Sequence, residues 1–367
     1  MSECKSAPLP TSVRQLAEQL PVERGNKGLR FERFFSGYDT EFTKTDTGSK
    51  RAALQKCVGG CGDTKALEQA SARCQQLTKA LGGQARVYST DWHLVTGTGN
   101  NNPVENGFTW HPTLGTPYLP GSTIKGLVRA WAEQFLGWDK VEIQRWFGIS
   151  EGGDGQVKEQ AGEVIFMDAF PIEPPMLKVD IMTPHMGKWY EKGSEKQDKN
   201  TIPGDWHAPV PVPFLVTNSA KFLFALAPRP GCTVDMDSVF DALTDALAWL
   251  GIGSKTSAGY GHLSPDEAQT QMLQRSSMNE GERLLAQLEE QFRREQQFGP
   301  NKGSEASKML QALEQNTEVT DWSHDVKSRL LQLAGEILKF HDPKAWNKLT
   351  KKKKPSLYMR LESLLAT

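Results

Sequence analysis

The chain has 367 residues, of which 38% are hydrophobic and 24% are charged, and its formal net charge is −1. This length and composition are typical of a soluble globular protein with two domains, and no apolar run reaches the length of a membrane span. Because the net charge is close to zero, an overall positive field that attracts nucleic acid is excluded. Any binding to RNA must therefore come from local basic patches.

Residues 1–5 lack the apolar segment of a secretory signal, so we expect a cytoplasmic protein with no membrane partner. The five cysteines are an odd number, which argues against a disulfide framework, and free thiols are expected. Cys57, Cys61 and Cys74 are not followed by a Cys or His pair at ligand spacing. We therefore expect neither a metal nor a cofactor.

Residues 1–83 are predicted to form a partly helical N-terminal extension. Basic residues are interleaved with aromatic ones between Arg24 and Phe35, which indicates arginine stems packed on rings, with an RNA platform as the alternative. The apolar residues of 64–81 recur at helical spacing, and two glycines follow. The predicted buried face of this helix consists of Leu67, Ala70, Cys74, Leu77 and Leu81.

Residues 84–263 are predicted to form an α+β domain. Its expected strands, from the alternation of apolar residues, are 85–95, 162–172, 176–183 and 214–226. With one helix after the first strand and another near the end, the order βαββαβ is that of a ferredoxin-like (RRM-like) domain.

Two further segments flank or interrupt this domain. An insertion at 184–210 is polar and too long for a hairpin turn. It carries His185, Lys188, Trp189 and Tyr190, where rings can stack on bases while lysines neutralise phosphate. Residues 264–367 have the apolar periodicity of a small helical bundle and are predicted to be a C-terminal helical extension.

The first helix of the α+β domain has a sharply specified start after Pro120-Gly121. We expect Ser122 to be its N-cap, and Lys125 and Arg129, four residues apart, to project together. Unpaired amides and the partial positive charge of a helix start, with these two cations, favour an anion site for successive phosphates. The alternative is that both cations are merely solvated.

Residues 251–261 contain four glycines and follow the amphipathic helix predicted over 239–250. Hydroxyl, ammonium and backbone N–H donors in this loop suit phosphate oxygens, although a plain helix end and turn is the alternative. A nucleotide-binding P-loop is disfavoured because Ser254, not glycine, precedes Lys255-Thr256, and because a helix rather than a strand comes before the loop.

Together, residues 117–129 and 251–261 resemble the RAMP superfamily of CRISPR RNA-binding proteins. Within it, the stretches 111–115, 179–185 and 204–215 are similar to the sixth-subunit family of type III-B (Cmr) effector complexes. The resemblance covers roughly residues 85–263.

This resemblance implies a non-catalytic subunit of an antiviral ribonucleoprotein that holds the 3′ part of the guide RNA and contributes to binding complementary target RNA. It implies other Cmr subunits as neighbours: the repeated backbone RAMP subunit, the small helical subunit and the end-capping RAMP subunit. The insertion at 184–210 matches in position the thumb-like insertion that wedges into the guide–target duplex. The residues expected at the RNA are Ser122, Thr123, Lys125, Arg129, His185, Lys188, Trp189, Gly251, Gly253, Ser254, Lys255, Thr256, Ser257, Gly259 and Gly261.

Two other classes of function stay open on the sequence. An RNA endonuclease of the RAMP family could use His111, His185, Asp180 and Asp205, but nothing in the sequence fixes a pair of them at reacting distance. A pure protein adaptor is favoured only by the slightly acidic balance and the helical extension.

Overall fold

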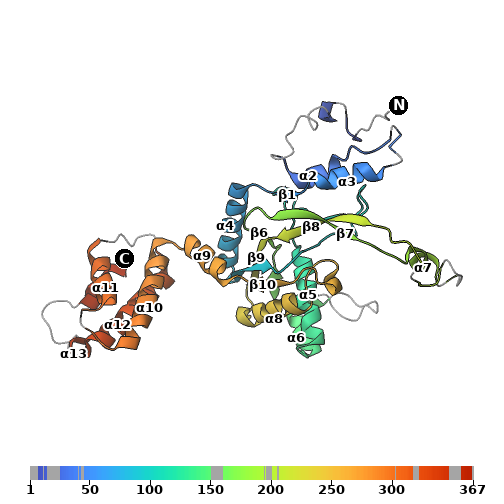
Figure 1. Ribbon diagram of the computed structural model, residues 1–367. Coiled ribbons are helices and arrows are strands. Elements are labelled where there is room, and N and C mark those ends of the chain that lie inside the picture. The colour runs from blue at the N-terminus through green and yellow to red at the C-terminus, as the bar shows by residue number, and fades with distance from the viewer. Residues whose placement is uncertain are drawn as a thin grey trace. The chain divides into compact units, whose positions relative to one another are not determined.

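The computed structural model describes residues 7–10, 12–14, 25–39, 41–42, 45–149, 160–193, 195, 201–204, 206–301, 303–316, 322–346 and 357–365. The chain forms two compact units, Met1–Thr270 and Gln271–Thr367, which are described separately (Figure 1). Of the residues named from the sequence, 1–5, Arg24, Asp205 and part of the insertion at 184–210 lie outside the described part.

The first unit is organised around an antiparallel sheet. Its strands, in spatial order, are β10 (Leu263–Pro265), β2 (Gln84–Thr90), β9 (Lys221–Pro228) and β5 (Val164–Phe166). A short strand, β6 (Phe170–Pro171), also pairs with β9. Helix α5 (Gly121–Gln134) lies in sequence between β2 and β5, and α8 (Met236–Trp249) between β9 and β10.

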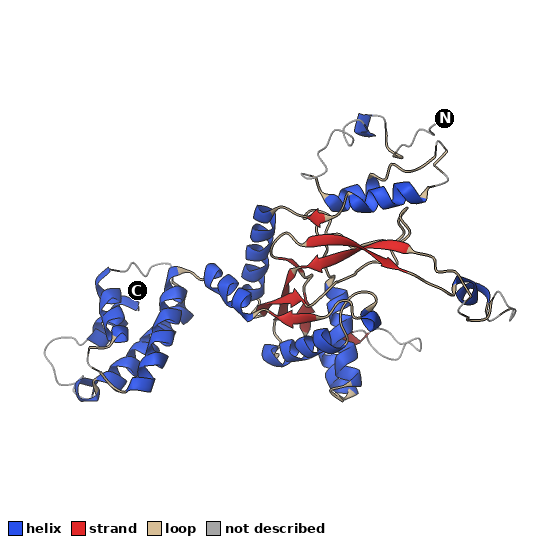
Figure 2. Cartoon of the chain, viewed as in Figure 1, coloured by secondary structure: helices blue, strands red, loops and turns tan. Residues whose placement is uncertain are grey.

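Helices cover both faces of this sheet. Alternate residues of β9, including Phe222 and Phe224, pack with α5 and α8 in one core, which also contains Ile124 and Leu243. Helix α4 (Thr64–Ala80) packs against β2 and β9, and Figure 2 shows the sheet between α4 and the α5–α8 pair. The sheet is therefore buried on both sides. The candidate site described below lies in the loops that connect the helices and strands of this sheet.

A second, three-stranded sheet has the order β1 (Gly59–Gly60), β7 (Met176–Met182) and β8 (Val212–Ser219), all antiparallel. The strand predicted at 176–183 is thus confirmed as a strand, but it lies in this sheet. The strand predicted at 214–226 is confirmed as strand except at Ala220, which separates β8 from β9. The chain does not reverse at Ala220, because Thr217 in β8 and Lys221 in β9 both pair antiparallel with one stretch of chain, at Leu94 and Ser89. The apolar pattern therefore runs on without a visible break.

Other elements of the first unit are short. The remaining ones are α2 (Lys27–Arg33), α3 (Thr47–Gln55), α6 (Lys140–Phe147), β3 (Gly148–Ile149), β4 (Gln160–Ala161), α7 (Gly187–Lys192) and the 3₁₀ turn η1 (Thr256–Ala258). The strand predicted at 85–95 ends at Thr90, and the one predicted at 162–172 is divided into β5 and β6. In α4, Leu67 is buried as predicted but Leu77 is exposed, because Ser71 and Thr78 complete the buried face instead.

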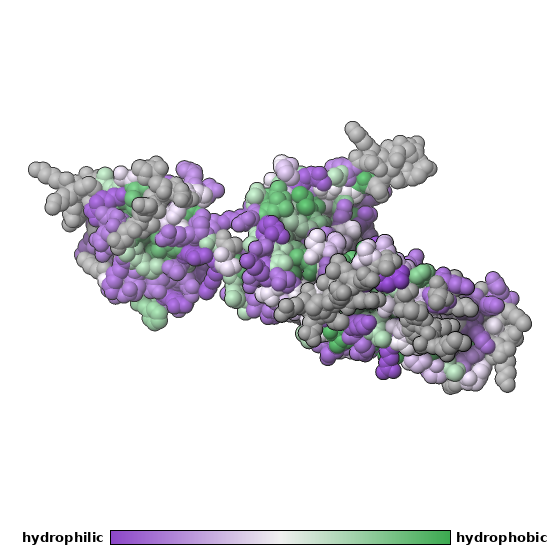
Figure 3. Space-filling view, turned by 90° about the horizontal axis from the view of Figure 1, so that it is seen from above, coloured by the Kyte–Doolittle hydropathy of each residue, from purple (hydrophilic) through white to green (hydrophobic). Residues whose placement is uncertain are grey.

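The second unit is helical, as the sequence predicts. Its helices are α10 (Glu280–Phe298), α11 (Glu305–Asn316), α12 (His324–His341), α13 (Pro343–Trp346) and α14 (Leu357–Leu365), and α9 (Glu267–Ser277) crosses the boundary between the units. Leu288, Leu310, Leu330 and Leu361 share one core. The face drawn in Figure 3 is mostly hydrophilic over this unit. None of the described helices is both long and apolar enough to cross a membrane.

Candidate nucleic-acid interface

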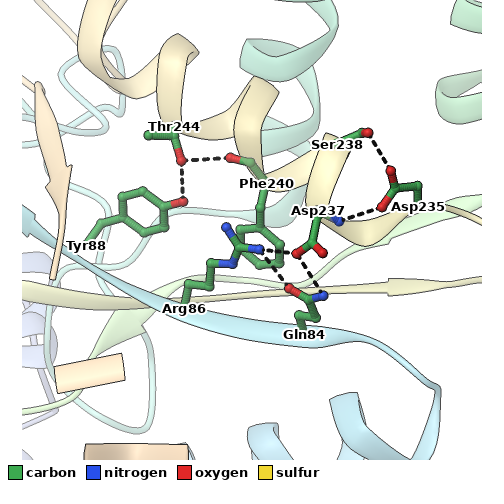
Figure 4. Close-up of polar contacts among 8 residues, drawn as sticks. All are labelled: Gln84, Arg86, Tyr88, Asp235, Asp237, Ser238, Phe240 and Thr244. Atoms are coloured by element: carbon green, nitrogen blue, oxygen red, sulfur yellow. Dashed lines mark hydrogen bonds and ion pairs between the residues drawn. The ribbon is translucent and has the colours of Figure 1, made fainter. Parts of the chain in front are cut away.

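Helix α8, which leads into the glycine loop, is fixed on strand β2 by polar contacts (Figure 4). Arg86 pairs with Asp237 and lies over the Phe240 ring, 4.4 Å from its centroid. The Tyr88 hydroxyl lies 2.7 Å from Thr244 Oγ1, and burial is the main cause that raises the pKa of Tyr88. These contacts hold the N-terminal half and the middle of α8 on β2, so the helix that leads into the loop is anchored.

Several glycines of the loop are required by close approach of the chain to itself. At Gly253 the φ angle is +96°, and a Cβ atom would lie 2.2 Å from the Val95 carbonyl oxygen. At Gly261 a Cβ atom would lie 2.0 Å from the Ile252 carbonyl oxygen. The loop is closed by hydrogen bonds from Ile252 N–H to the Gly261 carbonyl (2.8 Å) and from Ser254 N–H to the Val95 carbonyl (2.7 Å). Its inner side is therefore structural.

The outer rim of the loop differs from this inner side. Lys255 has a left-handed backbone, with φ of +62°. Within the described part of the chain, the N–H groups of Lys255, Thr256 and Ser257 have no hydrogen-bond acceptor. Lys255 Nζ donates to Met182 Sδ at 3.0 Å and lies 5.3 Å from the centroid of the Phe214 ring, and no described carboxylate pairs with it. A cation next to unsatisfied N–H donors is an arrangement that suits phosphate oxygens.

The start of helix α5 is already occupied by a carboxylate of the protein. The helix begins at Gly121 with Pro120 as its N-cap residue, so the predicted N-cap, Ser122, is wrong. The Gly121 N–H donates to Asp168 Oδ1 at 2.7 Å, and Asp168 comes from the connection between β5 and β6. Because this carboxylate offsets the positive end of the helix, the expectation of an unoccupied anion site there is not met.

The two cations predicted on α5 have different surroundings. Arg129 Nε pairs with Glu133 Oε1 at 2.8 Å, and both side chains are about half exposed. Lys125 is partly buried and makes no ion pair with any described residue. Helices α5 and α8 pack together, yet in the described ranges no hydrogen bond or ion pair joins Ser122, Thr123 or the two cations to the glycine loop.

The polar insertion lies at the tip of a β-ribbon. Strands β7 and β8 pair antiparallel up to Met182 and Val212, and α7 forms part of the segment beyond them (Figure 1). His185 and Lys188 are exposed, and Trp189 is partly buried against Gly193. No described contact connects these three residues with the glycine loop.

A cluster beside the loop combines Asp180, which the sequence analysis named only for an endonuclease, with Trp92, His93 and Tyr260, which it did not name. Asp180 Oδ2 accepts a hydrogen bond from the Tyr260 hydroxyl (2.7 Å) and lies 3.3 Å from His93 Nδ1, while His93 Nε2 lies 3.0 Å from Asn218 Oδ1. Trp92 stacks on His93 with the ring centroids 4.4 Å apart. The available signal was the pair Trp92-His93 at the end of a strand and Tyr260 within the glycine motif.

The same contacts decide the charge of this cluster. Burial alone would raise the pKa of Asp180, but hydrogen bonds from Tyr260, the Ile181 N–H and His93 outweigh it, and the net shift is downward. Burial and the neighbouring Asp180 raise the pKa of Tyr260 to about 12. Near neutral pH, Asp180 is therefore an anion and Tyr260 a neutral donor.

The residues named for an endonuclease are not gathered in one place. Asp180 is engaged by His93 and Tyr260, whereas His111 Nδ1 accepts from the Leu114 N–H at 3.3 Å and burial lowers its pKa. His185 is exposed and pairs with neither. The described residues contain no group of three or more His, Cys, Asp or Glu side chains that could hold a metal ion.

The N-terminal aromatic residues are mainly core. Phe31 and Phe35 are buried with Trp110, and the buried Lys27 ammonium donates to the carbonyls of Cys57 and Val58. Cys57 and Cys61 are free thiols, and burial raises their pKa values to about 11 and about 12.

Comparison with known proteins agrees with the RAMP resemblance. Residues 89–264 match the model of the RAMP superfamily. CRISPR system Cmr subunit Cmr6 of Pyrococcus furiosus is 30% identical over 230 residues, covering 48% of this chain and 66% of that protein. The Cmr6 subunit of Saccharolobus solfataricus is 26% identical over 161 residues, covering 42% of this chain and 47% of that protein. The matches thus span less than two thirds of either relative.

Among the solved structures that match the chain is a type III-B Cmr-beta complex bound to cognate target RNA. Its matching chain is 20% identical, with a TM-score of 0.43 over 59% of this chain and 71% of that chain. The crystal structure of Cmr6 from Pyrococcus furiosus matches with 25% identity and a TM-score of 0.31, over 50% of this chain and 97% of that one. From the family match and the two relatives, the chain belongs to the RAMP superfamily and is a Cmr-type RAMP protein similar to Cmr6.

Proposed function

We propose that the chain is a non-catalytic RNA-binding subunit of a type III-B CRISPR effector ribonucleoprotein in the cytoplasm. In this role it holds the 3′ part of the guide RNA backbone and contributes to binding of complementary target RNA. The observation that carries the proposal is the outer rim of the glycine loop. There Lys255, with no described carboxylate partner, adjoins three N–H donors that have no acceptor in the described part of the chain.

Binding through such groups neutralises phosphates without reading bases. Ammonium and backbone N–H donors contact the sugar–phosphate chain and leave the base edges available to pair with a target strand. Lys125 is the side chain of helix α5 best suited to extend this contact, because it has no described ion-pair partner, whereas Arg129 is paired with Glu133. Ser122 and Thr123 are exposed on the same helix and stay predicted RNA contacts.

The strand order β10-β2-β9-β5 with one helix inside each half supports a ferredoxin-like assignment for this sheet. On that assignment, the insertion beyond β7 and β8 corresponds to the thumb-like insertion of RAMP proteins. An exposed tip that carries His185, Lys188 and Trp189 at the end of a two-stranded ribbon suits a wedge between paired strands.

We assign no catalytic role to the chain, because no acid–base pair among the described residues is positioned on an open site. His93 and Asp180 do approach each other, but both nitrogens of His93 already face side-chain partners and Tyr260 occupies Asp180. The expected result is that an assembled effector with Asp180→Asn or His185→Ala cleaves target RNA at the unaltered rate. If either variant assembled normally but no longer cleaved target RNA, the endonuclease function would be favoured instead.

The direct test of the proposed function is co-expression of the tagged chain with a type III-B locus, followed by purification and limited RNase digestion. We expect guide RNA to co-purify with the repeated backbone subunit, the small helical subunit and the end-capping RAMP subunit. The protected fragment associated with this chain should include the 3′ part of the guide. Purification free of RNA, or protection confined to the 5′ part, would contradict the proposal.

A further inference from the structure

Trp92 is an exposed aromatic side chain that stacks on a ring held in place by other residues. Its side chain is 49% exposed, and the indole lies nearly parallel to the His93 ring, at 15° and with 4.4 Å between centroids. An isolated surface tryptophan is ordinary. This one is different because the ring on which it rests is itself fixed.

The supporting ring, His93, is held in place by contacts that involve three other residues. His93 is fixed through both of its nitrogens, by Asp180 and by Asn218. Tyr260, which donates to Asp180, lies 4.9 Å from Trp92 and 6.2 Å from His93 between ring centroids. These two distances and the Trp92–His93 distance form a triangle with nearly a right angle at Trp92. Tyr260 therefore lies beside the indole, and the indole face opposite His93 is not covered by either ring.

Trp92 is connected to the outer rim of the loop through other aromatic rings. Tyr260 connects the two, since its ring contacts Trp92 and Phe214, and the Phe214 ring lies under the Lys255 ammonium. Its backbone N–H also donates to the Lys255 carbonyl, at 3.4 Å. A flat, preorganised aromatic face beside a cation and N–H donors matches the two halves of a nucleotide, the base and the phosphate.

We propose that Trp92 is a stacking platform for one unpaired nucleobase of the RNA whose phosphate lies on the Lys255–Ser257 rim. This inference rests on the proposed function and makes it more specific. The indole face accepts any base, because every base has a π-face, so the contact adds affinity and order without sequence preference. Trp92 and Lys255 are the positioning residues, one for a base and one for a phosphate.

The test compares two single-stranded probes of equal length bound to the full chain: oligouridylate, and the same ribose–phosphate strand without bases. For oligouridylate, we expect Trp92→Ala to weaken binding about tenfold, within the range that loss of one base-stacking ring gives. For the abasic strand, Trp92→Ala should leave the affinity unchanged. For both probes, the salt dependence of binding should be the same in the variant as in the wild type, because no phosphate contact is lost. Trp92→Phe should keep most of the affinity for oligouridylate.

Trp249→Ala is the matched control, since Trp249 is 74% exposed at the end of α8 and stacks on no described ring. Equal losses on the two probes, or equal losses in Trp92→Ala and Trp249→Ala, would overturn the platform. Unchanged RNA affinity with loss of co-purifying Cmr subunits would instead assign Trp92 to a protein contact and also overturn it. If the wild-type protein bound neither probe, both the proposed function and the stacking platform would be refuted. If it bound both probes and Trp92→Ala had no effect, only the platform would be refuted.

Discussion

The glycine loop and the start of helix α5 look equivalent in the sequence, as two anion sites rich in donors, but they differ in the folded chain. At α5 the first N–H group donates to Asp168, and Arg129 is paired with Glu133. At the loop, Lys255 has no described carboxylate partner, and three consecutive N–H groups have no described acceptor. The difference teaches that a donor-rich motif is available to a ligand only where the protein's own carboxylates do not already satisfy it.

The largest expected effect is the loss of stability caused by an alanine on the inner side of the loop, at Gly253. Gly253→Ala should lower the free energy of unfolding of the first unit by roughly 2–4 kcal/mol, since a Cβ would meet the Val95 carbonyl in a left-handed backbone. Urea denaturation followed by hydrogen exchange of peptides from the first unit measures it. Gly259→Ala is the control. Its φ is +87° but its Cβ would meet no atom within 4 Å, so only about 1 kcal/mol of backbone strain is expected. Equal losses would mean that the loop is not closed on Val95.

The second effect tests which cation contacts RNA. Lys255→Ala should weaken binding to single-stranded RNA several-fold and reduce the slope of log affinity against log salt by about 0.7, the value for one phosphate contact. Arg129→Ala should leave the slope nearly unchanged, because its guanidinium is already paired with Glu133. Titrations at several salt concentrations measure both variants. A larger slope change in Arg129→Ala than in Lys255→Ala would reverse the comparison.

The third effect concerns the carboxylate of Asp180, which accepts a hydrogen bond from Tyr260 of the loop. Asp180→Asn should destabilise the first unit by about 1–2 kcal/mol at neutral pH, because the anion accepts hydrogen bonds from Tyr260 and the Ile181 N–H. The pKa of Asp180 is lowered in the folded chain, so its stabilisation is present above its unfolded value, about 3.9, and is lost as the pH falls through the folded value. The difference between wild type and variant should therefore shrink below about pH 4. A difference that grew on acidification would show that the neutral acid, not the anion, makes these contacts.

The smallest effect concerns the carboxylate at the helix. Asp168→Ala should cost about 1 kcal/mol of stability, as for loss of a helix cap, when measured by urea denaturation. RNA affinity should change by less than about twofold, because the helix end is not the main phosphate contact on this account. An increase in affinity well beyond that would show that Asp168 shields an anion site at α5 that RNA can use.

Much of this architecture could be predicted because it depends on local pattern. The helical unit, α4, α5, α8 and the glycine loop follow from apolar periodicity and from glycines after a helix. The division of 214–226 between two sheets at Ala220 could not be predicted, since the chain keeps its direction there and the apolar alternation continues.

The features of the site that were missed are all long-range. Asp168 lies 47 residues from Gly121, and Asp180 lies 80 residues from Tyr260. Whether a donor is already satisfied is decided by such partners, which neither spacing nor residue type reveals. The same limit applies to Trp92: its supporting ring belongs to the next residue, His93, but the groups that fix His93 lie 87 residues away in Asp180 and 125 residues away in Asn218.

The most direct measurement is ultraviolet crosslinking of the assembled complex, with mass mapping of the RNA-linked peptides of this chain. On the present account, linked peptides cover residues 251–261, and linkage in 121–131 is weaker. Linkage in 121–131 with 251–261 unlinked would contradict the account, because the helix start, despite Asp168, would then be the principal RNA contact.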